Sequence, residues 1–285
     1  MTVKMYVDLE VERLIPLYSK DEAKALVTIV LEDLCNIPAH CYYSDPDRLL
    51  PVEQLPYVQR ASLDLQRGRP IQYILGKAFF DGLEIQVREG VLIPRPETQE
   101  LVRWAKQLLL DGNQIMDLCT GSGAIAIALS KVFPQSKVYG VDLYKDALDV
   151  GIENNRLNHT DVHFIQADIL QDPNLYRSAL LPHSFDLIIS NPPYVRMGEK
   201  GQMRTNVLEW EPHHALFVPD DDPLLFYRAL GRWGKAFLKE GGRVMAEINK
   251  EMGDEVTALL VGHGYKSVQV VKDLNGNERM VSAFL

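Results

Sequence analysis

Two helical patterns dominate the first quarter of the chain. The first begins at Ser19-Lys20-Asp21-Glu22, a capping box in which the serine and the glutamate side chains satisfy free backbone donors at a helix N-terminus. Its apolar residues recur at helical spacing and share one face. They are Ala23, Leu26, Val27, Val30, Leu31 and Leu34. A second helical run extends from about Leu55 to Gly68, and Pro70 prevents its continuation. We therefore expect residues 1–75 to form a small helical bundle.

A short β-pattern follows the helical region. Between Gly76 and Pro94, two strand-like runs flank Asp81-Gly82, a dipeptide that favours the positive φ angles of a tight hairpin turn. We expect residues 76–95 to form a β-hairpin that links two domains. The chain then passes through two prolines before a helix predicted from about Glu97 to Leu110. This entry segment is either a plain helix start with an acidic first turn or a rigid rim beside a pocket.

From Ile115 onward, strand and helix patterns alternate, which predicts an α/β fold with a mostly parallel sheet. The strands are expected near 115–119, 137–142, 162–165, 185–190 and 243–248. Helices are expected after Ser122, after Lys145, over 222–239 and over 252–261, with Gly241-Gly242 as a helix stop. In the tail, β-type runs at 267–271 and 279–284 flank Asn275-Gly276, a strong hairpin signal. Residues 96–285 thus have the Rossmann-like outline of a class I methyltransferase, with a C-terminal antiparallel hairpin.

Composition limits the classes of partner. The 285 residues carry a formal net charge of −9, which is unfavourable for sequence-independent binding to a phosphate backbone. Three cysteines form an odd set without metal-ligand spacing, and the seven histidines show no metal motif, so we predict no metal and no disulfide framework. The sequence shows neither a signal-like N-terminus nor an apolar run long enough to span a bilayer. We expect a cytoplasmic protein, a monomer, with no direct nucleic-acid partner and no membrane partner.

A glycine loop after the first strand of the α/β region is the candidate cofactor site. It runs Asp117-Leu118-Cys119-Thr120-Gly121-Ser122-Gly123 and opens a helix whose N-terminus favours negative charge. Asp142 ends the next strand, beside Leu143, where a carboxylate can accept both ribose hydroxyls of an adenosine-type cofactor. Gly121-x-Gly123-x-x-Ala126 also satisfies a relaxed dinucleotide fingerprint, so NAD is an alternative.

Two further positions fit a cofactor of this type. Asp168 follows the third strand, where its carboxylate can accept from an adenine amino group while Ile169 packs on the ring. Asp142 and Asp168 could instead be helix caps without a ligand.

The strand at 185–190 delivers Asn191-Pro192-Pro193-Tyr194 to its carboxyl end. Two prolines fix φ near −65°, remove two donors and hold the preceding residues extended, which makes a rigid corner. The corner offers the Asn191 side-chain oxygen and the Pro192 carbonyl oxygen to a planar –NH2 group, with Tyr194 available to stack on it. Methyl transfer to nitrogen has a use for such a corner, and hydride transfer has none. A plain strand followed by a rigid turn is the structural alternative.

The chain resembles the HemK/PrmC family of release-factor glutamine methyltransferases over nearly its full length. The resemblance depends on five segments in order: residues 68–76, 92–98, 117–123, 191–194 and 211–216. It implies S-adenosylmethionine as the cofactor, S-adenosylhomocysteine (SAH) as the product and a helical N-terminal domain that recognises the release factor. It also implies that Asn191 and Pro192 hold the glutamine amide of the factor's Gly-Gly-Gln loop.

The residue patterns and the resemblance together give the full set of expected site residues. For the cofactor they are Asp117, Cys119, Thr120, Gly121, Ser122, Gly123, Asp142, Leu143, Asp168, Ile169 and Asn191. For the protein substrate they are Pro96, Glu97, Thr98, Asn191, Pro192, Pro193 and Tyr194, of which Asn191, Pro192 and Tyr194 are the candidate catalytic residues.

Two positions depart from the family pattern, which usually has glycine where this chain has Cys119 and alanine where it has Gly151. Cysteine at the first position is also familiar in a sister group that methylates a glutamine of a ribosomal protein, and that substrate is one alternative. The others are a nucleic-acid amino-methyltransferase, an NAD-dependent oxidoreductase and a catalytically idle protein that binds a translation factor. The segment Pro94 to Thr98 favours release factors.

Overall fold

The computed structural model describes residues 1–285 and contains two compact units. The first unit comprises Met1–Gly76 together with Arg204–Trp210, and the second comprises Lys77–Met203 and Glu211–Leu285. A short segment far along the chain therefore groups with the N-terminal residues. No helix has the length and apolar character needed to cross a lipid bilayer.

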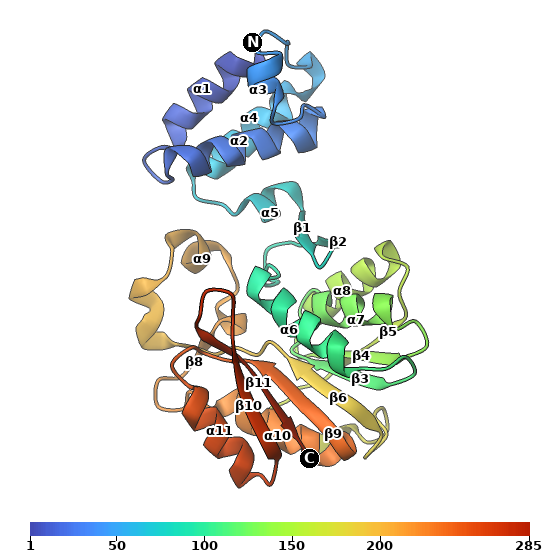
Figure 1. Ribbon diagram of the computed structural model, residues 1–285. Coiled ribbons are helices and arrows are strands. Elements are labelled where there is room, and N and C mark those ends of the chain that lie inside the picture. The colour runs from blue at the N-terminus through green and yellow to red at the C-terminus, as the bar shows by residue number, and fades with distance from the viewer. The chain divides into compact units, whose positions relative to one another are not determined.

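The first unit is a helical bundle (Figure 1). Its helices are α1 (Val3–Leu14), α2 (Lys20–Cys35), α3 (Cys41–Ser44), the 3-10 helix η1 (Val52–Gln54), α4 (Leu55–Gln66), α5 (Ile71–Leu75) and α9 (Thr205–Trp210). The serine half of the predicted capping box forms at α2, where the Glu22 backbone N–H donates to Ser19 Oγ at 3.2 Å, whereas the Glu22 side chain pairs with Arg204. The apolar stripe of α2 packs into the core of the bundle. Arg204 extends this unit through an ion pair of 3.1 Å with Glu22.

The second unit is organised around a seven-stranded sheet with the order β10-β11-β9-β6-β3-β4-β5 (Figure 1). Its strands are β3 (Gln114–Leu118), β4 (Lys137–Asp142), β5 (Val162–Gln166), β6 (Phe185–Ser190), β9 (Leu238–Glu247), β10 (Lys266–Lys272) and β11 (Glu278–Phe284). The pairs from β5 to β9 are parallel, and β11 pairs antiparallel with both β9 and β10. The predicted mostly parallel sheet with a C-terminal antiparallel hairpin is confirmed.

Helices cover both faces of this sheet (Figure 1). One group consists of α6 (Pro96–Leu108), α7 (Ala124–Val132) and α8 (Lys145–Leu157), and α7 contacts both of its neighbours. The other consists of α10 (Leu225–Phe237) and α11 (Gly253–Gly262), preceded along the chain by the 3-10 helix η2 (Pro173–Tyr176). The core on the α10 side is centred on large buried aromatic residues, which include Tyr227, Trp233 and Phe237. Burial of these large apolar side chains stabilises the packing of α10 against the sheet.

The expected helix stop at Gly241-Gly242 is wrong. Helix α10 ends at Phe237, and the chain enters β9 directly at Leu238, so both glycines lie inside a strand. The pairing with β6 is irregular there, because Phe185 pairs with Leu238 whereas Leu187 pairs with Arg243. Gly241 has a φ of +74°, which only glycine adopts without strain. The two glycines therefore allow a bulge in the strand.

The hairpin of β1 (Lys77–Phe80) and β2 (Leu83–Gln86) forms around Asp81-Gly82, as predicted. It groups with the second unit, where two asparagines of the α8 helix and its C-cap anchor its backbone. The Asn154 side chain accepts from the Gln86 N–H at 2.6 Å and donates to the Gln86 carbonyl at 3.0 Å. The Asn158 side chain donates to the Glu84 carbonyl at 2.9 Å. These bonds attach the hairpin to the α/β unit rather than leaving it as a free linker.

The segment between β6 and α10 contains elements that the sequence patterns did not predict. They are β7 (Val195–Arg196), the 3-10 helix η3 (Met197–Gln202), α9, the 3-10 helix η4 (His213–Ala215) and β8 (Phe217–Val218). The two-residue strands β7 and β8 pair in parallel. Elements this short have no usable periodicity, which is why pattern analysis does not find them.

Phe164 explains why this chain carries glycine at position 151. A Cβ atom added at Gly151 would lie 2.6 Å from the Phe164 ring, and one added at Gly140 would lie 2.9 Å from it. Gly123, at the start of α7, is similarly close to the ring, at 3.2 Å. The three glycines thus surround one aromatic side chain, and helix α8 approaches β5 closely because Gly151 lacks a side chain.

Replacing Gly151 by alanine is therefore expected to destabilise the protein by about 1–3 kcal/mol through overpacking. Gly262→Ala is the matched control, because its added Cβ meets nothing within 4 Å and should stabilise helix α11 by up to about 1 kcal/mol. Urea unfolding measures both changes. In the double variant Gly151→Ala/Phe164→Leu, the loss of unfolding free energy should be clearly smaller than the sum of the two single losses, because the smaller leucine side chain at position 164 leaves room for the added methyl group. Additive losses would show that the ring is not the obstacle.

Candidate functional site

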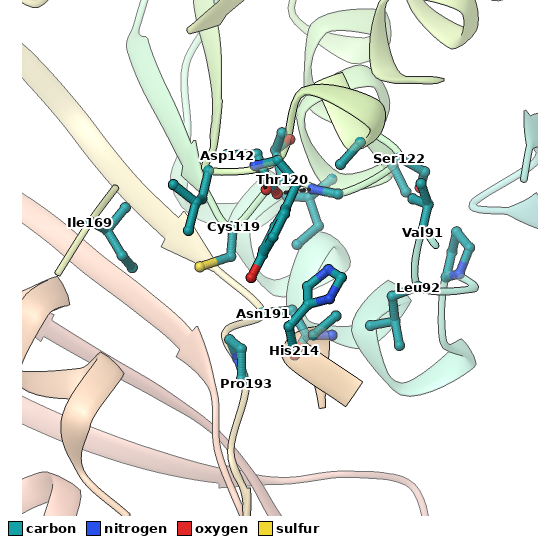
Figure 2. Close-up of a pocket in the computed structure, with 18 of the residues that line it drawn as sticks. Val91, Leu92, Cys119, Thr120, Ser122, Asp142, Ile169, Asn191, Pro193 and His214 are labelled. Carbon is teal, nitrogen blue, oxygen red and sulfur yellow. Dashed lines mark hydrogen bonds between the residues drawn. The ribbon is translucent and has the colours of Figure 1, made fainter. Parts of the chain in front are cut away.

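A pocket lies at the carboxyl ends of the central parallel strands, within the second unit (Figure 2). Strand β3 lies between β4 and β6, and the chain order of the strands reverses there, which is where ligands bind in open α/β sheets. Each of the three strands delivers a predicted site residue to the pocket wall: Cys119 after β3, Asp142 at the end of β4 and Asn191 after β6. The topology therefore brings together residues that are far apart in the sequence, such as Cys119 and Asn191, which are 72 positions apart.

The loop after β3 is held by a buried carboxylate. Asp117 Oδ2 accepts from the Thr120 hydroxyl at 2.6 Å and from the Ala126 N–H at 3.3 Å, so it joins the loop to the first turn of α7. Its other oxygen, Oδ1, is buried without a hydrogen-bond partner. Asp117 is fully buried and does not line the pocket. It supports the loop from behind.

Cys119 occupies a backbone conformation that favours glycine. Its φ is +58°, in the left-handed region, which carries a penalty of roughly 1–2 kcal/mol for a residue with a Cβ. This geometry gives a physical reason for the glycine that the family pattern usually has at this position. The side chain lines the pocket and packs against the core of the unit, and burial raises the pKa of the Cys119 thiol well above its ordinary value.

Burial raises the pKa of Asp117 to about 7 from an ordinary value of 3.8, and the bonds from Thr120 and Ala126 only partly oppose this. Nearby Asp142 raises it further. A raised native pKa means that the native state binds the proton more tightly than the unfolded chain does. The associated stability is therefore fully present below about pH 4, and it is lost as the pH rises through about 7.

We expect the free energy of unfolding of the ligand-free protein to fall between about pH 4 and pH 8 by a few kcal/mol because of Asp117. Asp117→Asn has no titrating group at this position, so it should lack this part of the pH dependence. Chemical denaturation of both proteins across this range measures the difference. Asp161→Asn, on the exposed surface, is the control and should follow the wild-type curve. Parallel curves for wild type and Asp117→Asn would contradict the account.

Asp142 is placed to bind hydroxyl groups. Its Oδ2 accepts from the Gly121 N–H at 2.8 Å and its Oδ1 accepts from the Tyr144 N–H at 3.0 Å. Each carboxylate oxygen can accept a second bond, so both remain able to bind a ligand. Burial raises the pKa of Asp142, and the two backbone N–H groups counteract this effect. A buried carboxylate in this setting is well suited to the paired hydroxyls of a ribose.

The corner after β6 is tied to two other elements. Asn191 Nδ2 donates to Thr98 Oγ1 at 2.9 Å, and the Thr98 hydroxyl donates to Glu247 Oε2 at 2.7 Å. The Tyr194 hydroxyl donates to the other oxygen of the same carboxylate, Glu247 Oε1, at 2.7 Å. Thr98 lies in the first turn of α6, and Glu247 ends β9. The Asn191 side chain therefore lies at the pocket with its amide nitrogen already engaged.

The structure brings most of the predicted site residues to the pocket, but not all of them. The residues that line it are Thr98, Cys119, Thr120, Gly121, Ser122, Asp142, Leu143, Asp168, Ile169, Asn191 and Pro193. Those that do not are Pro96, Glu97, Asp117, Gly123, Pro192 and Tyr194. The ring of Tyr194 packs against the core of the unit, which differs from the expected stacking on a planar ligand. Its hydroxyl reaches Glu247 instead because that carboxylate is buried behind the corner.

Sequence patterns missed two other parts of the site. The rings of His214 and Tyr144 contact each other with centroids 3.8 Å apart and planes inclined at 36°, and both residues line the pocket. Burial lowers the pKa of His214, and nearby Asp142 opposes this shift. The pocket rim is fixed by Arg95, which donates to Glu211 Oε1 at 2.7 Å, while Glu211 Oε2 accepts from the Ile93 N–H. Neither contact joins the ends of two parallel strands, and local patterns do not pair Tyr144 with His214 or Arg95 with Glu211, which are 116 positions apart.

Comparisons with known proteins agree with this geometry. Residues 109–261 match a family model described as a methyltransferase domain. The release factor glutamine methyltransferase of Flavobacterium psychrophilum is 40% identical and covers 99% of this chain and 98% of its own. The protein of the same name from Bacteroides thetaiotaomicron is 38% identical, with 94% of each chain covered.

Solved structures agree at the level of the fold. A methyltransferase from Pyrococcus furiosus matches with a TM-score of 0.51 and 18% identity, over 71% of this chain and 89% of that one. The structure of SMU.776 complexed with SAH also matches with a TM-score of 0.51, at 16% identity, over 74% of this chain and 56% of that one.

Proposed function

The chain belongs to the family of release factor glutamine methyltransferases, and we propose that it methylates the side-chain amide nitrogen of a glutamine in peptide chain release factors. We further propose that the glutamine is that of the Gly-Gly-Gln motif and that S-adenosylmethionine is the methyl donor. The observation that carries the proposal is the Asn191 side chain, which lines the same pocket as Asp142 and the loop after β3.

The residues of the pocket fit S-adenosylmethionine. Asp142 offers two carboxylate oxygens for ribose hydroxyls, and apolar side chains such as Ile169 and Phe226 line a wall that suits an adenine ring. The Asp142 carboxylate lines the pocket and Asp117 lies buried behind the loop, and carboxylates in these places fit a cofactor with a cationic amino group better than an anionic one. When bound, the cofactor supplies a methyl group on a positively charged sulfur.

The same charges argue against the NAD alternative. A dinucleotide places a diphosphate at the glycine loop, where helix N-termini usually attract it. Here Asp142 lines the pocket beside that loop, and Asp117 lies buried behind it, close enough for Asp142 to raise the pKa of Asp117. A diphosphate would therefore meet the Asp142 carboxylate, with a second carboxyl group behind the loop. A nucleic-acid substrate is similarly disfavoured by the net charge of −9.

The pocket can promote the reaction through hydrogen bonds alone. An amide nitrogen is a poor nucleophile because its lone pair is delocalised into the carbonyl group. The Asn191 Oδ1 atom and the Pro192 carbonyl oxygen would each accept from one of the two amide protons, which aims the nitrogen lone pair and stabilises the positive charge that develops on nitrogen. Such positioning of bound reactants can lower a barrier by roughly 7–11 kcal/mol. The proton leaves to solvent after transfer.

The helical first unit is proposed to recognise the release factor, and the enzyme is proposed to act as a monomer in the cytoplasm, where translation takes place.

Cys119 raises the question whether the protein substrate is a release factor or a ribosomal protein. Because Cys119 lies in the loop after β3, beside the proposed cofactor site, its identity does not select the protein substrate. The strongest support for release factors comes from relatives that match over nearly the whole chain, both units included.

Transfer of a labelled methyl group to several substrates tests this proposal. Purified release factor, ribosomal proteins, DNA and RNA are each incubated with the protein and labelled S-adenosylmethionine. We expect label on the release factor and on none of the others. Label on a ribosomal protein alone, or on nucleic acid, would overturn the proposed substrate. A stable complex with the release factor but no label would indicate a binding protein instead.

A further inference from the structure

Asn191 must present a particular atom to the substrate. A carboxamide has one acceptor end, Oδ1, and one donor end, Nδ2, and the two ends differ little in shape. Only Oδ1 can accept a proton from an incoming –NH2 group. Rotation of the Asn191 side chain by half a turn would place Nδ2 at the ligand, where donor would face donor. The corner therefore works only if something distinguishes the two ends.

The hydrogen-bond chain behind Asn191 makes this distinction. Glu247 is 1% exposed, and an ionised carboxylate accepts hydrogen bonds without donating any. The Thr98 hydroxyl must then use its single proton to donate to Glu247 Oε2, at 2.7 Å. Having donated, its oxygen can only accept from its other neighbour, and it accepts from Asn191 Nδ2 at 2.9 Å. The direction of each bond follows from the one behind it.

We propose that Thr98 and Glu247 are positioning residues that fix the orientation of the Asn191 carboxamide, so that Oδ1 is the atom left to accept from the substrate amide. The inference deepens the proposed function and rests on it. No protein group donates to Asn191 Oδ1, which leaves it available for a ligand at the pocket where Figure 2 shows Asn191. Neither Thr98 nor Glu247 needs to touch the reacting atoms.

The position of Glu247 in the fold supports this role. An isolated carboxylate would be expensive to bury, yet this one ends strand β9 among apolar residues and is held by two hydroxyl groups. The second hydroxyl is that of Tyr194, which donates to Glu247 Oε1 at 2.7 Å. Tyr194 belongs to the same corner as Asn191. Burial raises the pKa of Glu247, and the bonds from Thr98 and Tyr194 together with the nearby Arg279 oppose this shift and favour the ionised form. The carboxylate thus anchors the corner at both ends, through Thr98 to Asn191 and directly to Tyr194.

A pair of substitutions at Thr98 separates orientation from packing. Thr98→Val keeps the shape of the side chain but neither donates nor accepts, so the Asn191 carboxamide can turn. Thr98→Ser keeps the hydroxyl and loses only a methyl group. We expect kcat for release-factor methylation to fall by about 10-fold in Thr98→Val and by no more than about 2-fold in Thr98→Ser. The Kd for S-adenosylmethionine should change by less than about 2-fold in both. Thr160→Val, which removes a hydroxyl bonded to Asn155, is the matched control and should retain wild-type kcat.

A double-mutant cycle tests whether Thr98 acts through Asn191. In the Asn191→Ala background the carboxamide is absent, so Thr98→Val should lower the residual kcat by less than about 2-fold. An equal loss in both backgrounds would overturn the inference, and so would equal rates for Thr98→Val and Thr98→Ser. If the wild-type protein did not methylate a release factor, the proposed function would fail first.

A measurement without substrate keeps the inference testable in that case as well. In the 15N–1H NMR spectrum, the side-chain NH2 signal of Asn191 is assigned by its loss in Asn191→Ala. Its chemical shifts should change strongly in Thr98→Val, because the hydroxyl that accepts from this group is gone, and should stay close to the wild-type values in Thr98→Ser. An unchanged Asn191 NH2 signal in Thr98→Val would contradict the proposed hydrogen-bond chain, whatever the substrate is.

Discussion

Replacing Asn191 by alanine is expected to lower kcat for methyl transfer by about 10²-fold or more, because it removes an acceptor for the amide protons of the substrate at the moment when positive charge develops on nitrogen. The Kd for the cofactor should change much less, since Asp142 and the loop after β3 are untouched. Single-turnover kinetics with release factor, together with calorimetry of cofactor binding, separates these two effects.

Asn174→Ala is the control for this variant, because Asn174 lies on the exposed surface at η2 and makes its side-chain bond to Asp172. It should retain wild-type turnover. Wild-type turnover in Asn191→Ala would contradict the proposed role of the corner. A fall in cofactor affinity large enough to explain the lost rate would assign Asn191 to cofactor binding instead.

Asp142→Ala is expected to weaken binding of S-adenosylmethionine by about 10²-fold, because hydrogen bonds to a charged group contribute about 1.5–3 kcal/mol each. At saturating cofactor, kcat should fall by less than about 10-fold, since Asp142 does not hold the amide. Part of the loss in affinity would come from the glycine loop, because the variant also removes the acceptor of the Gly121 N–H, which donates to Asp142 at 2.8 Å. Calorimetry gives the affinity, and initial rates at high cofactor concentration give kcat.

Asp146→Asn removes the same charge from the exposed start of α8, four residues further along the chain, and should leave cofactor affinity near the wild-type value. If Asp146→Asn weakened binding as much as Asp142→Ala, the effect would come from net charge rather than from contact with a ribose. Unchanged affinity in Asp142→Ala would show that the cofactor lies elsewhere.

The α/β region could be predicted closely because each of its elements carries its own local signal. Strand β6 is a short apolar run, α7 follows a glycine loop, and the last hairpin is marked by Asn275-Gly276. The strand that follows α10 is the exception. Gly241-Gly242 has the composition of a helix stop, and only its neighbours in the sheet show that it is a bulge in β9. Local composition does not distinguish these two uses of glycine.

The contacts within the site could be predicted less completely. Asn191 and Asp142 follow strands whose carboxyl ends meet, so parallel topology was sufficient to place them together. Glu247 was missed although it directly follows the apolar run Val244-Met245-Ala246 at the end of a strand, which is a signal that could have identified it. The chain from Glu247 through Thr98 to Asn191 joins three elements, and no local pattern reports such a connection.

The two departures from the family pattern have different physical origins. Gly151 is explained by the Phe164 ring, which occupies the space of the missing methyl group. Cys119 is held at a φ of +58° by the turn itself, and its side chain does not relieve that strain. A neighbouring side chain thus accounts for Gly151, whereas Cys119 carries a local penalty in backbone energy at the edge of the proposed cofactor pocket.

Mass analysis of a release factor after incubation with the protein and S-adenosylmethionine shows whether the protein methylates the Gly-Gly-Gln glutamine. We expect a gain of one methyl group, about 14 Da, in the intact factor, with fragments that place it on the side chain of that glutamine. Asn191→Ala should produce little of this product in the same time. No gain in mass, or a methyl group on any other residue, would contradict the account.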